Sequence, residues 1–145
     1  MCSSLSASSR SSLKHLKKLI DSGANVNFSK TDGTTPLINA AMSKWSNGVK
    51  LLLDNGAKIN HKNWEGNNAL MNMLDYNLFY DDDVDSKIYD IVVIFIEHGV
   101  NLMVKNKNGK TVFDININVE KYIEENYPDM YSEYAILKDS EKYNL

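Results

Sequence analysis

The sequence is poor in cysteine and proline, and it has no long apolar run. Its one cysteine, Cys2, leaves no partner for an internal disulfide, so packing must stabilise the fold. We therefore expect an intracellular protein of the cytoplasm. No stretch approaches the about 18 consecutive apolar residues of a membrane-spanning helix. The N-terminus also lacks the apolar core of a secretory signal, so we expect no membrane association.

Basic residues are also fewer than acidic residues. Sixteen Lys and Arg residues stand against 19 Asp and Glu, which gives a net charge of −3 and a pI of about 5.6. A general nucleic-acid-binding domain carries a basic stripe and a higher pI, so we expect no nucleic-acid partner. The seven glycines do not cluster, which excludes a phosphate-binding loop. The 145 residues suit one domain.

The sequence does contain an internal repeat. The segment SGANVN at 22–27 returns as NGAKIN at 55–60. Two series of glycines follow the same rhythm, each with a spacing of 33 and then 43 residues: Gly23, Gly56 and Gly99, and Gly33, Gly66 and Gly109. Because both series show the same excess of ten, they indicate a period of 33 with one ten-residue insertion.

Residues 31–60 show what one repeat contains. A turn at Asp32-Gly33 precedes Pro36, which suits the first turn of a helix because that position needs no backbone N–H. A second helix with apolar residues at i, i+3 and i+4 ends just before Gly56, which suits a left-handed C-terminal cap. Such a unit is too small to bury its own apolar face, so the repeats must stack.

The chain resembles the ankyrin-repeat family over about residues 3–126. The resemblance is strongest at Asp32-Gly33-Thr34-Thr35-Pro36-Leu37, Ala40-Ala41, Leu52-Leu53 and Gly56-Ala57. It implies an all-α solenoid of about four helix-turn-helix repeats with β-hairpin-like loops and atypical terminal repeats. Within an ankyrin-repeat domain at 1–126, we expect repeats at about 1–30, 31–63, 64–106 with an insertion near 77–86, and 107–126; a helix or tail follows at 127–145.

Both ends depart from the repeat pattern. Residues 3–30 align with 36–63 without a gap, so we expect two helices in the first repeat, a polar Ser-rich one and a second over 13–22. The Ser-rich stretch could instead be a disordered tail or a phosphorylation cluster. At the other end the repeat that opens at Asn108 shortens, and Pro128 ends its truncated helices.

Three positions inside the repeats also depart from the family. Lys44 stands where a glycine usually makes the turn between the helices, and Gly48 stands at an apolar position. Met103 replaces the asparagine found at Asn27 and Asn60, so we expect its loop to lack a side-chain hydrogen bond that the others can make.

No cluster of residues predicts catalysis, so we expect no enzyme and no cofactor. The histidines His15, His61 and His98 are scattered, and no Ser or Cys is placed as a nucleophile. Four carboxylates within 81–85 could hold a hard cation, but the glycine and distal Glu of an EF-hand are absent, so we favour a solvated acidic loop and no metal. Together with the apolar residues at 78–80, this insertion could also be an acidic-aromatic recognition segment.

The family resemblance implies a protein-binding surface. Stacked repeats align the hairpin tips and the exposed sides of the first helices in a concave strip, on which Glu65 and Asp75 also fall. Trp64 is the principal candidate, because a Trp on a polar hairpin is a typical interface anchor; alternatively it packs on its own repeat. We expect these partner-binding residues: Lys30, Asp32, Asn39, Met42, Lys62, Trp64, Asn72, Tyr76, Lys105 and Lys107.

We expect a monomer that binds a protein partner. The preference for Lys over Arg and the abundance of Asn, Ile and Tyr are typical of an AT-rich genome such as that of a large DNA virus or a protist, and for a virus the partner would be a host regulatory protein. One alternative is a structural protein that self-associates through the apolar helix at 88–96 and the Tyr-rich C-terminus. A weaker alternative is cation-responsive binding through 81–85.

Overall fold

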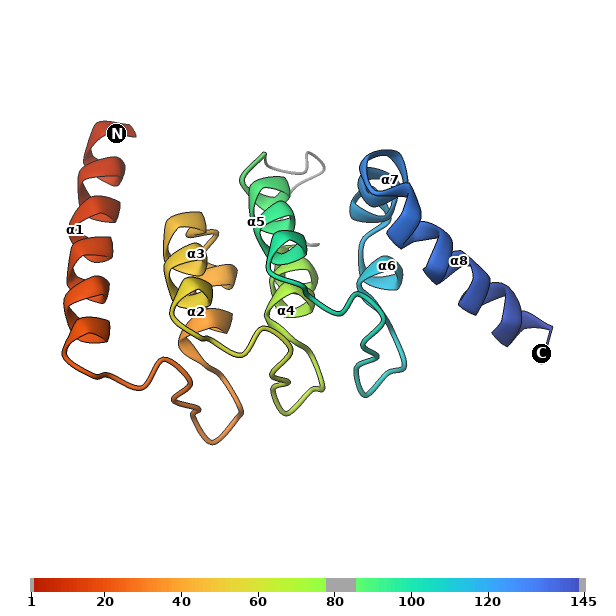
Figure 1. Ribbon diagram of the computed structural model, residues 1–145, viewed down its shortest axis with the longest axis horizontal. Coiled ribbons are helices and arrows are strands. Elements are labelled where there is room, and N and C mark those ends of the chain that lie inside the picture. The colour runs from red at the N-terminus through yellow and green to blue at the C-terminus, as the bar shows by residue number, and fades with distance from the viewer. Residues whose placement is uncertain (1, 78–85, 144–145) are drawn as a thin grey trace.

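The helices stand in two rows, with loops projecting from one end of the stack (Figure 1). The computed structural model describes residues 2–77 and 86–143, which contain eight helices and no strand. In chain order the helices are α1 (Cys2–Asp21), α2 (Pro36–Met42), α3 (Ser46–Asp54), α4 (Ala69–Asn77), α5 (Ser86–Glu97), α6 (Val112–Ile115), α7 (Ile117–Asn126) and α8 (Pro128–Lys142). The expected all-α solenoid is confirmed.

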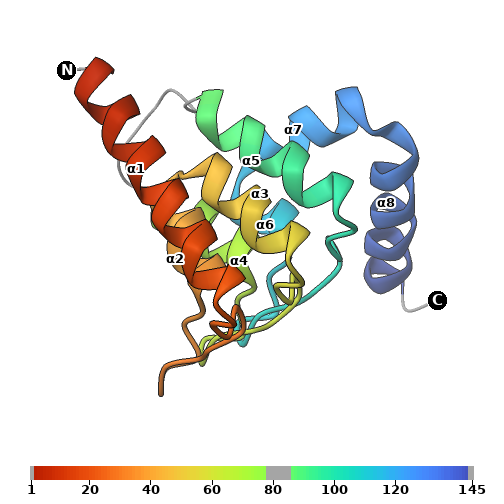
Figure 2. The ribbon, with the colours of Figure 1, turned by 60° about the vertical axis from the view of Figure 1, so that its left-hand side comes forward.

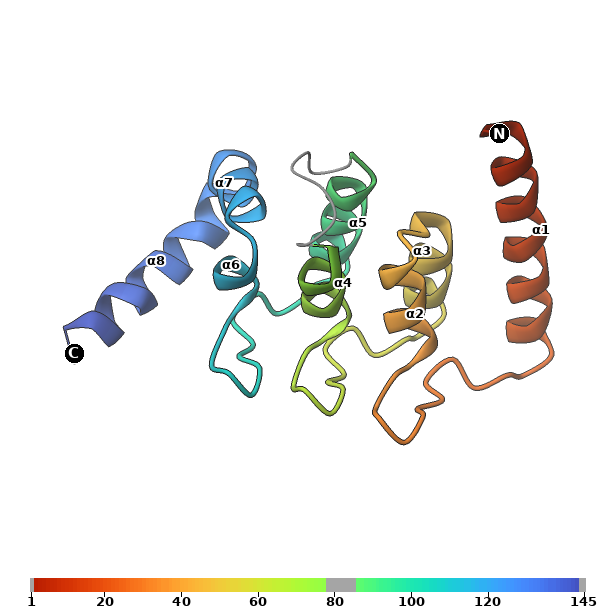
Figure 3. The same ribbon diagram turned by 180° about the vertical axis from the view of Figure 1, so that it is seen from behind.

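The second and third repeats each contribute one helix to each row. The short inner helices pack in sequence, α2 against α4 and α4 against α6, and in the outer row α1 packs against α3 and α3 against α5. Figure 3 shows the inner row from its own side, and Figure 2 shows how the outer helices α1, α3 and α5 succeed one another across the stack. The three long loops between repeats leave the same end of the helices, so their tips form a row.

A continuous apolar core explains the stacking. Leu37, Ala41 and Met73 of the inner helices and Ile91 and Phe95 of α5 are at most 1% exposed. Burying such side chains contributes roughly 1.5–3 kcal/mol each, which no isolated repeat could gain. The strongly apolar α5 is covered by α3 and α4, as a helix apolar on nearly every side requires.

The turn between α2 and α3 accommodates both departures of the second repeat. Lys44 adopts the left-handed conformation with φ of 56°, which costs a non-glycine residue about 1 kcal/mol. A Cβ added to Gly48 would lie 2.3 Å from the ring of Trp45. The apolar position is therefore a glycine because Trp45 lies directly over it.

The prediction of two helices in the first repeat was wrong. Residues 2–21 form the single helix α1, and its contact with α3 places it in the outer row. The segment contains no glycine or proline, and Ser11 stands where Lys44 makes the turn in the second repeat. Because nothing there interrupts the i to i−4 hydrogen bonds, the helix continues and the first repeat has no inner helix.

The C-terminal region forms a helical cap. The last repeat is truncated as expected in α6, and Pro128 occupies the first turn of α8. The Tyr134 ring stacks on Phe113 with centroids 4.0 Å apart, and the Tyr134 hydroxyl donates to Asp114 over 3.4 Å. Residues 128–142 thus take the helical one of the two forms that the sequence left open. The insertion at 78–85 lies outside the described residues.

Asparagine side chains tie successive repeats together at the start of the first two loops. Asn27 Oδ1 accepts from the Lys58 backbone N–H over 2.8 Å, and Asn60 Oδ1 accepts from that of Asn101 over 3.0 Å. Met103 stands at the third equivalent position, and its side chain has no amide oxygen to accept such a bond.

Candidate functional site

The three loops are joined to one another through their backbones. The Trp64 N–H donates to Asp32 O over 2.9 Å, and the Lys107 N–H donates to Glu65 O over 3.1 Å. Gly66 permits this approach, because a Cβ there would lie 2.9 Å from the Lys107 nitrogen. The loops therefore form one continuous surface in which each tip is positioned by its neighbour.

Asparagine side chains shape the second and third loops from within. Asn63 Oδ1 accepts from the backbone N–H groups of Glu65 and Asn67, at 3.0 and 3.1 Å. Asn106 repeats the arrangement in the third loop, and its Nδ2 donates to Asn67 Oδ1 over 3.0 Å. Because these bonds hold the backbone on both sides of the tips, the loops need little ordering when a partner binds.

A hollow of about 270 Å³ lies between the second and third loops and α4. Trp64 is 65% exposed there, so it does not pack down on its own repeat. The lining of the hollow is otherwise polar and consists of Glu65, Asn67, Asp75, Asn106, Lys107 and Asn108. This size falls just below the roughly 300–1,000 Å³ of pockets for drug-sized ligands, and it suits a single side chain.

Two of the predicted lysines are occupied within the protein. Lys62 Nζ donates to Lys105 O over 3.4 Å, and the Lys105 ammonium pairs with Glu141 of α8. This pairing raises the pKa of Lys105. Both side chains thus bridge neighbouring elements of the stack, while Lys107 lines the hollow.

The first loop carries Lys30 and Asp32, both exposed. Asp32 Oδ1 accepts from the Thr34 N–H over 2.9 Å. This bond and the Thr34 hydroxyl lower the pKa of Asp32, with a smaller contribution from the charge of Lys30. The carboxylate of Asp32 therefore shapes its own loop.

The remaining predicted residues lie on the inner helices α2 and α4. Met42 and Asn72 meet, with Asn72 Nδ2 donating to the Met42 sulfur over 3.0 Å. Asn39 instead lines a different groove, beside Leu16 of α1. Tyr76 lies in the last turn of α4, and its side chain is outside the described part of the structure.

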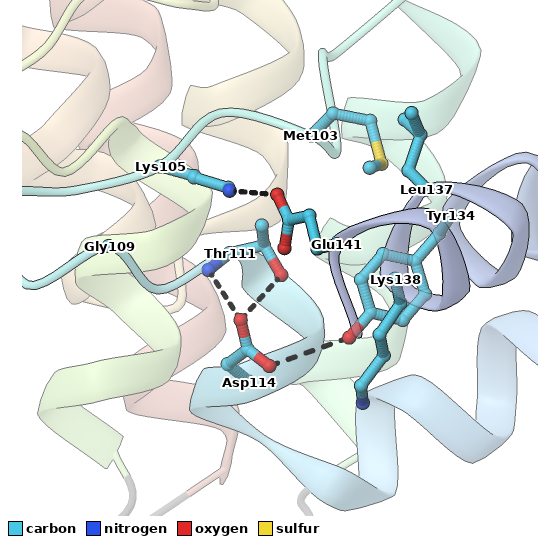
Figure 4. A pocket seen from close by; sticks show the side chains of 9 residues that line it. All are labelled: Met103, Lys105, Gly109, Thr111, Asp114, Tyr134, Leu137, Lys138 and Glu141. Atoms are coloured by element: carbon cyan, nitrogen blue, oxygen red, sulfur yellow. Dashed lines mark hydrogen bonds and ion pairs between the residues drawn. The ribbon is translucent and has the colours of Figure 1, made fainter. Parts of the chain in front are cut away.

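Two further hollows lie elsewhere in the stack, apart from the hollow beside Trp64. A groove of about 380 Å³ lies between α1 and α2, where the absent inner helix of the first repeat would stand, and Pro36, Ala40 and Trp45 contribute to it. A hollow of about 110 Å³ lies under the C-terminal cap (Figure 4). Figure 4 shows its polar groups engaged with each other, since Asp114 accepts from Thr111 and Tyr134. This smaller hollow belongs to the docking of α8.

One titratable contact was not predicted from the sequence. His98 Nδ1 donates to Ile94 O over 2.8 Å and Nε2 donates to Asp54 Oδ1 over 2.9 Å. Both bonds require the protonated ring, since neutral imidazole donates from one nitrogen only. The Asp54 carboxylate, followed by the Ile94 carbonyl, accordingly raises the pKa of His98. The contact ties α3 to the end of α5.

Metal-ligand geometry is lacking over the described ranges 2–77 and 86–143, where no group of three His, Cys, Asp or Glu residues could hold an ion. The acidic segment 81–85 lies outside them. Among the helices of the same ranges, none is long and apolar enough to cross a bilayer.

Comparison with known proteins agrees with the observed stack. A family model described as ankyrin repeats, three copies, matches residues 4–79, more than half of the chain. No curated protein matches it. Ankyrin repeats are in general modules for protein–protein interaction and are typically not catalytic. From its sequence match, its 33-residue period and its paired helices with joined loops, the chain belongs to the ankyrin-repeat family.

Proposed function

We propose that the protein is a non-catalytic binding module that holds a partner protein along its loop strip. We define the loop strip as the row of loop tips together with the exposed side of α4. The main observation in support of this proposal is Trp64. Its aromatic side chain is 65% exposed, in a loop whose backbone is hydrogen-bonded to the loops on both sides. Tryptophans of this kind are enriched among residues that dominate binding energy.

The rigidity of the strip supports this proposal. Each loop tip is held by backbone bonds to its neighbour, and the second and third are also held by an asparagine side chain from within. A preformed surface loses little conformational freedom on binding, so more of the contact energy appears as affinity. Partner choice then depends on the side chains that line the hollow.

The alternative of self-association has less support. The apolar face of α5 is used inside the stack, with Ile88, Ile91 and Phe95 buried. Tyr134 is likewise buried, and Tyr131 packs its ring against Phe113 with centroids 6.0 Å apart. We therefore expect a monomer, which light scattering in solution tests directly.

Site-directed cross-linking tests the loop strip. In a Cys2→Ser background, a benzophenone is attached at Asn108→Cys beside the hollow or at Glu133→Cys on exposed α8, and both proteins are incubated in lysate of the source cell. We expect one protein adduct at the first position and none at the second. Adding Trp64→Ala should reduce the adduct at least about 30-fold, the loss expected of a residue worth 2 kcal/mol.

A matched substitution controls for lost apolar surface. Ile136 on α8 is 69% exposed, so Ile136→Ala removes comparable apolar exposure far from the hollow. We expect it to leave the adduct unchanged, and melting curves of both variants to match the parent. An adduct that forms equally well with Trp64→Ala would refute the proposed site.

A further inference from the structure

The hollow beside Trp64 combines an aromatic face with an excess of negative charge. Glu65 and Asp75 contribute two carboxylates and Lys107 one ammonium group, so the lining has a formal charge of −1. The neutral groups around them are amides. A cation is the side chain that this lining favours.

Two amides of the hollow, those of Asn67 and Asn106, are bonded to each other. Asn67 Nδ2 donates to Glu65 Oε2 over 3.4 Å, and Asn67 Oδ1 accepts from Asn106 Nδ2 over 3.0 Å. A carboxylate offers about four lone-pair sites, and Asn67 takes only one of those on Glu65. The Glu65 carboxylate therefore keeps acceptor capacity for a ligand in the hollow.

The aromatic wall distinguishes between the possible cations. An indole face is the strongest cation–π partner among the side chains, and a planar guanidinium can stack on it while its edges donate to carboxylates. A lysine ammonium, a compact and strongly hydrated charge, gains less from the same arrangement. The volume of about 270 Å³ is that of a side-chain subsite.

We infer that the hollow lined by Trp64, Glu65 and Asp75 binds an arginine side chain of the partner protein. The guanidinium lies against the Trp64 indole and donates to the two carboxylates, while Lys107, which also lines the hollow, limits the affinity by repulsion. This inference rests on the proposed function, since it specifies the chemistry of the partner at the same surface.

A capped tripeptide supplies the probe. Acetyl-Gly-Arg-Gly-amide is titrated into ¹⁵N-labelled protein at low salt, and the Trp64 indole N–H signal is assigned with Trp64→Phe. We expect a saturable shift of the Trp64 signal and none of Trp45. The citrulline peptide, which has the same shape without the charge, should bind at least about fivefold more weakly, as should the lysine peptide.

Charge variants test the two carboxylates. Glu65→Gln with Asp75→Asn should abolish the saturable shift, while Glu125→Gln with Glu133→Gln removes the same charge from exposed positions on α7 and α8 and should leave it within twofold. Lys107→Gln should strengthen arginine binding severalfold. Unchanged melting temperatures establish that each variant is folded.

Several results would overturn the inference. Equal binding of the citrulline peptide, full binding by the Glu65→Gln/Asp75→Asn protein, or tighter binding of acetyl-Gly-Glu-Gly-amide would each do so. The cross-linking experiment separates this failure from that of the proposed function. A partner captured through Trp64 with no arginine binding means a non-basic partner, and arginine binding without capture means that the strip holds no protein.

Discussion

Two glycines at equivalent positions allow the contact between loops to be measured. Gly66 and Gly109 occupy the same place in successive loops and have φ of 80° and 74°. A Cβ at Gly66 would lie 2.9 Å from the Lys107 nitrogen and 3.2 Å from the Asn106 Cα, whereas a Cβ at Gly109 would meet nothing within 4 Å. The two alanine substitutions therefore differ in one respect: the new methyl group meets the neighbouring loop at position 66 and meets nothing at position 109.

The expected magnitudes follow from these surroundings. Both alanines carry the penalty of a left-handed residue, about 1 kcal/mol, and the same gain from a less flexible unfolded chain. Gly66→Ala must also push the loops apart, which weakens the Lys107–Glu65 backbone bond at about 1 kcal/mol and strains the Asn106–Asn67 bond. We expect Gly66→Ala to cost about 1–2 kcal/mol more than Gly109→Ala.

Thermal unfolding monitored by circular dichroism provides the measurement. For a chain of this size, 1 kcal/mol corresponds to about 3 °C in Tm, so the two variants should differ by about 3–6 °C. Trp64 emission should change in Gly66→Ala and stay constant in Gly109→Ala. Equal Tm values for the two variants would show that the close approach of the loops contributes nothing to stability.

Two further predictions concern contacts between helices. His98→Gln removes a group whose pKa is raised by Asp54, so the stability that His98 adds is fully present below its unfolded pKa of about 6.5 and lost as pH rises through the folded value. His98→Gln should hence destabilise the protein more at pH 5.5 than at pH 8.5, by less than about 1 kcal/mol because Asp54 is half exposed; a Tm difference from the parent that grows with pH would contradict this. Tyr134→Ala removes the ring stacked on Phe113 and should cost about 3 kcal/mol, with faster hydrogen exchange confined to α8; uniform acceleration over all helices would contradict it.

The sequence predicted those parts of the fold that depend on local backbone rules. Pro36 begins α2, and glycines after the helices adopt positive φ, as at Gly56 with 88°. The period of 33 located the second and third repeats because each repeat must match its neighbour in length to stack. These features require no knowledge of distant contacts.

The first repeat could not be predicted in the same way. Its alignment with 36–63 implied a break, but a break forms only where something favours it. In the second repeat Trp45 packs over Gly48 and the inner helix α2 has a neighbour on α4. Residues 2–11 contain no glycine or proline that would interrupt a helix, so the local preference for a continuous helix prevails in α1.

The candidate site was predicted only in part for a related reason. Of the predicted residues, Trp64 and Lys107 line the hollow, whereas Lys62 and Lys105 contact other parts of the stack. The partner of Lys105 is Glu141, 36 residues away on a helix whose existence the sequence left open. Side-chain pairing of this kind depends on the angle of α8, which the repeat pattern does not contain.

The repeat also explains how the hollow beside Trp64 differs from the equivalent place one repeat earlier. One repeat earlier, the positions equivalent to Trp64 and Asp75 are Thr31 and Met42, so the corresponding place offers neither an indole face nor the α4 carboxylate. The backbone bonds that join the loops are nevertheless the same in both places, from Trp64 to Asp32 and from the third loop to the second. The shared backbone therefore provides the surface, and the few side chains that differ between repeats provide its selectivity.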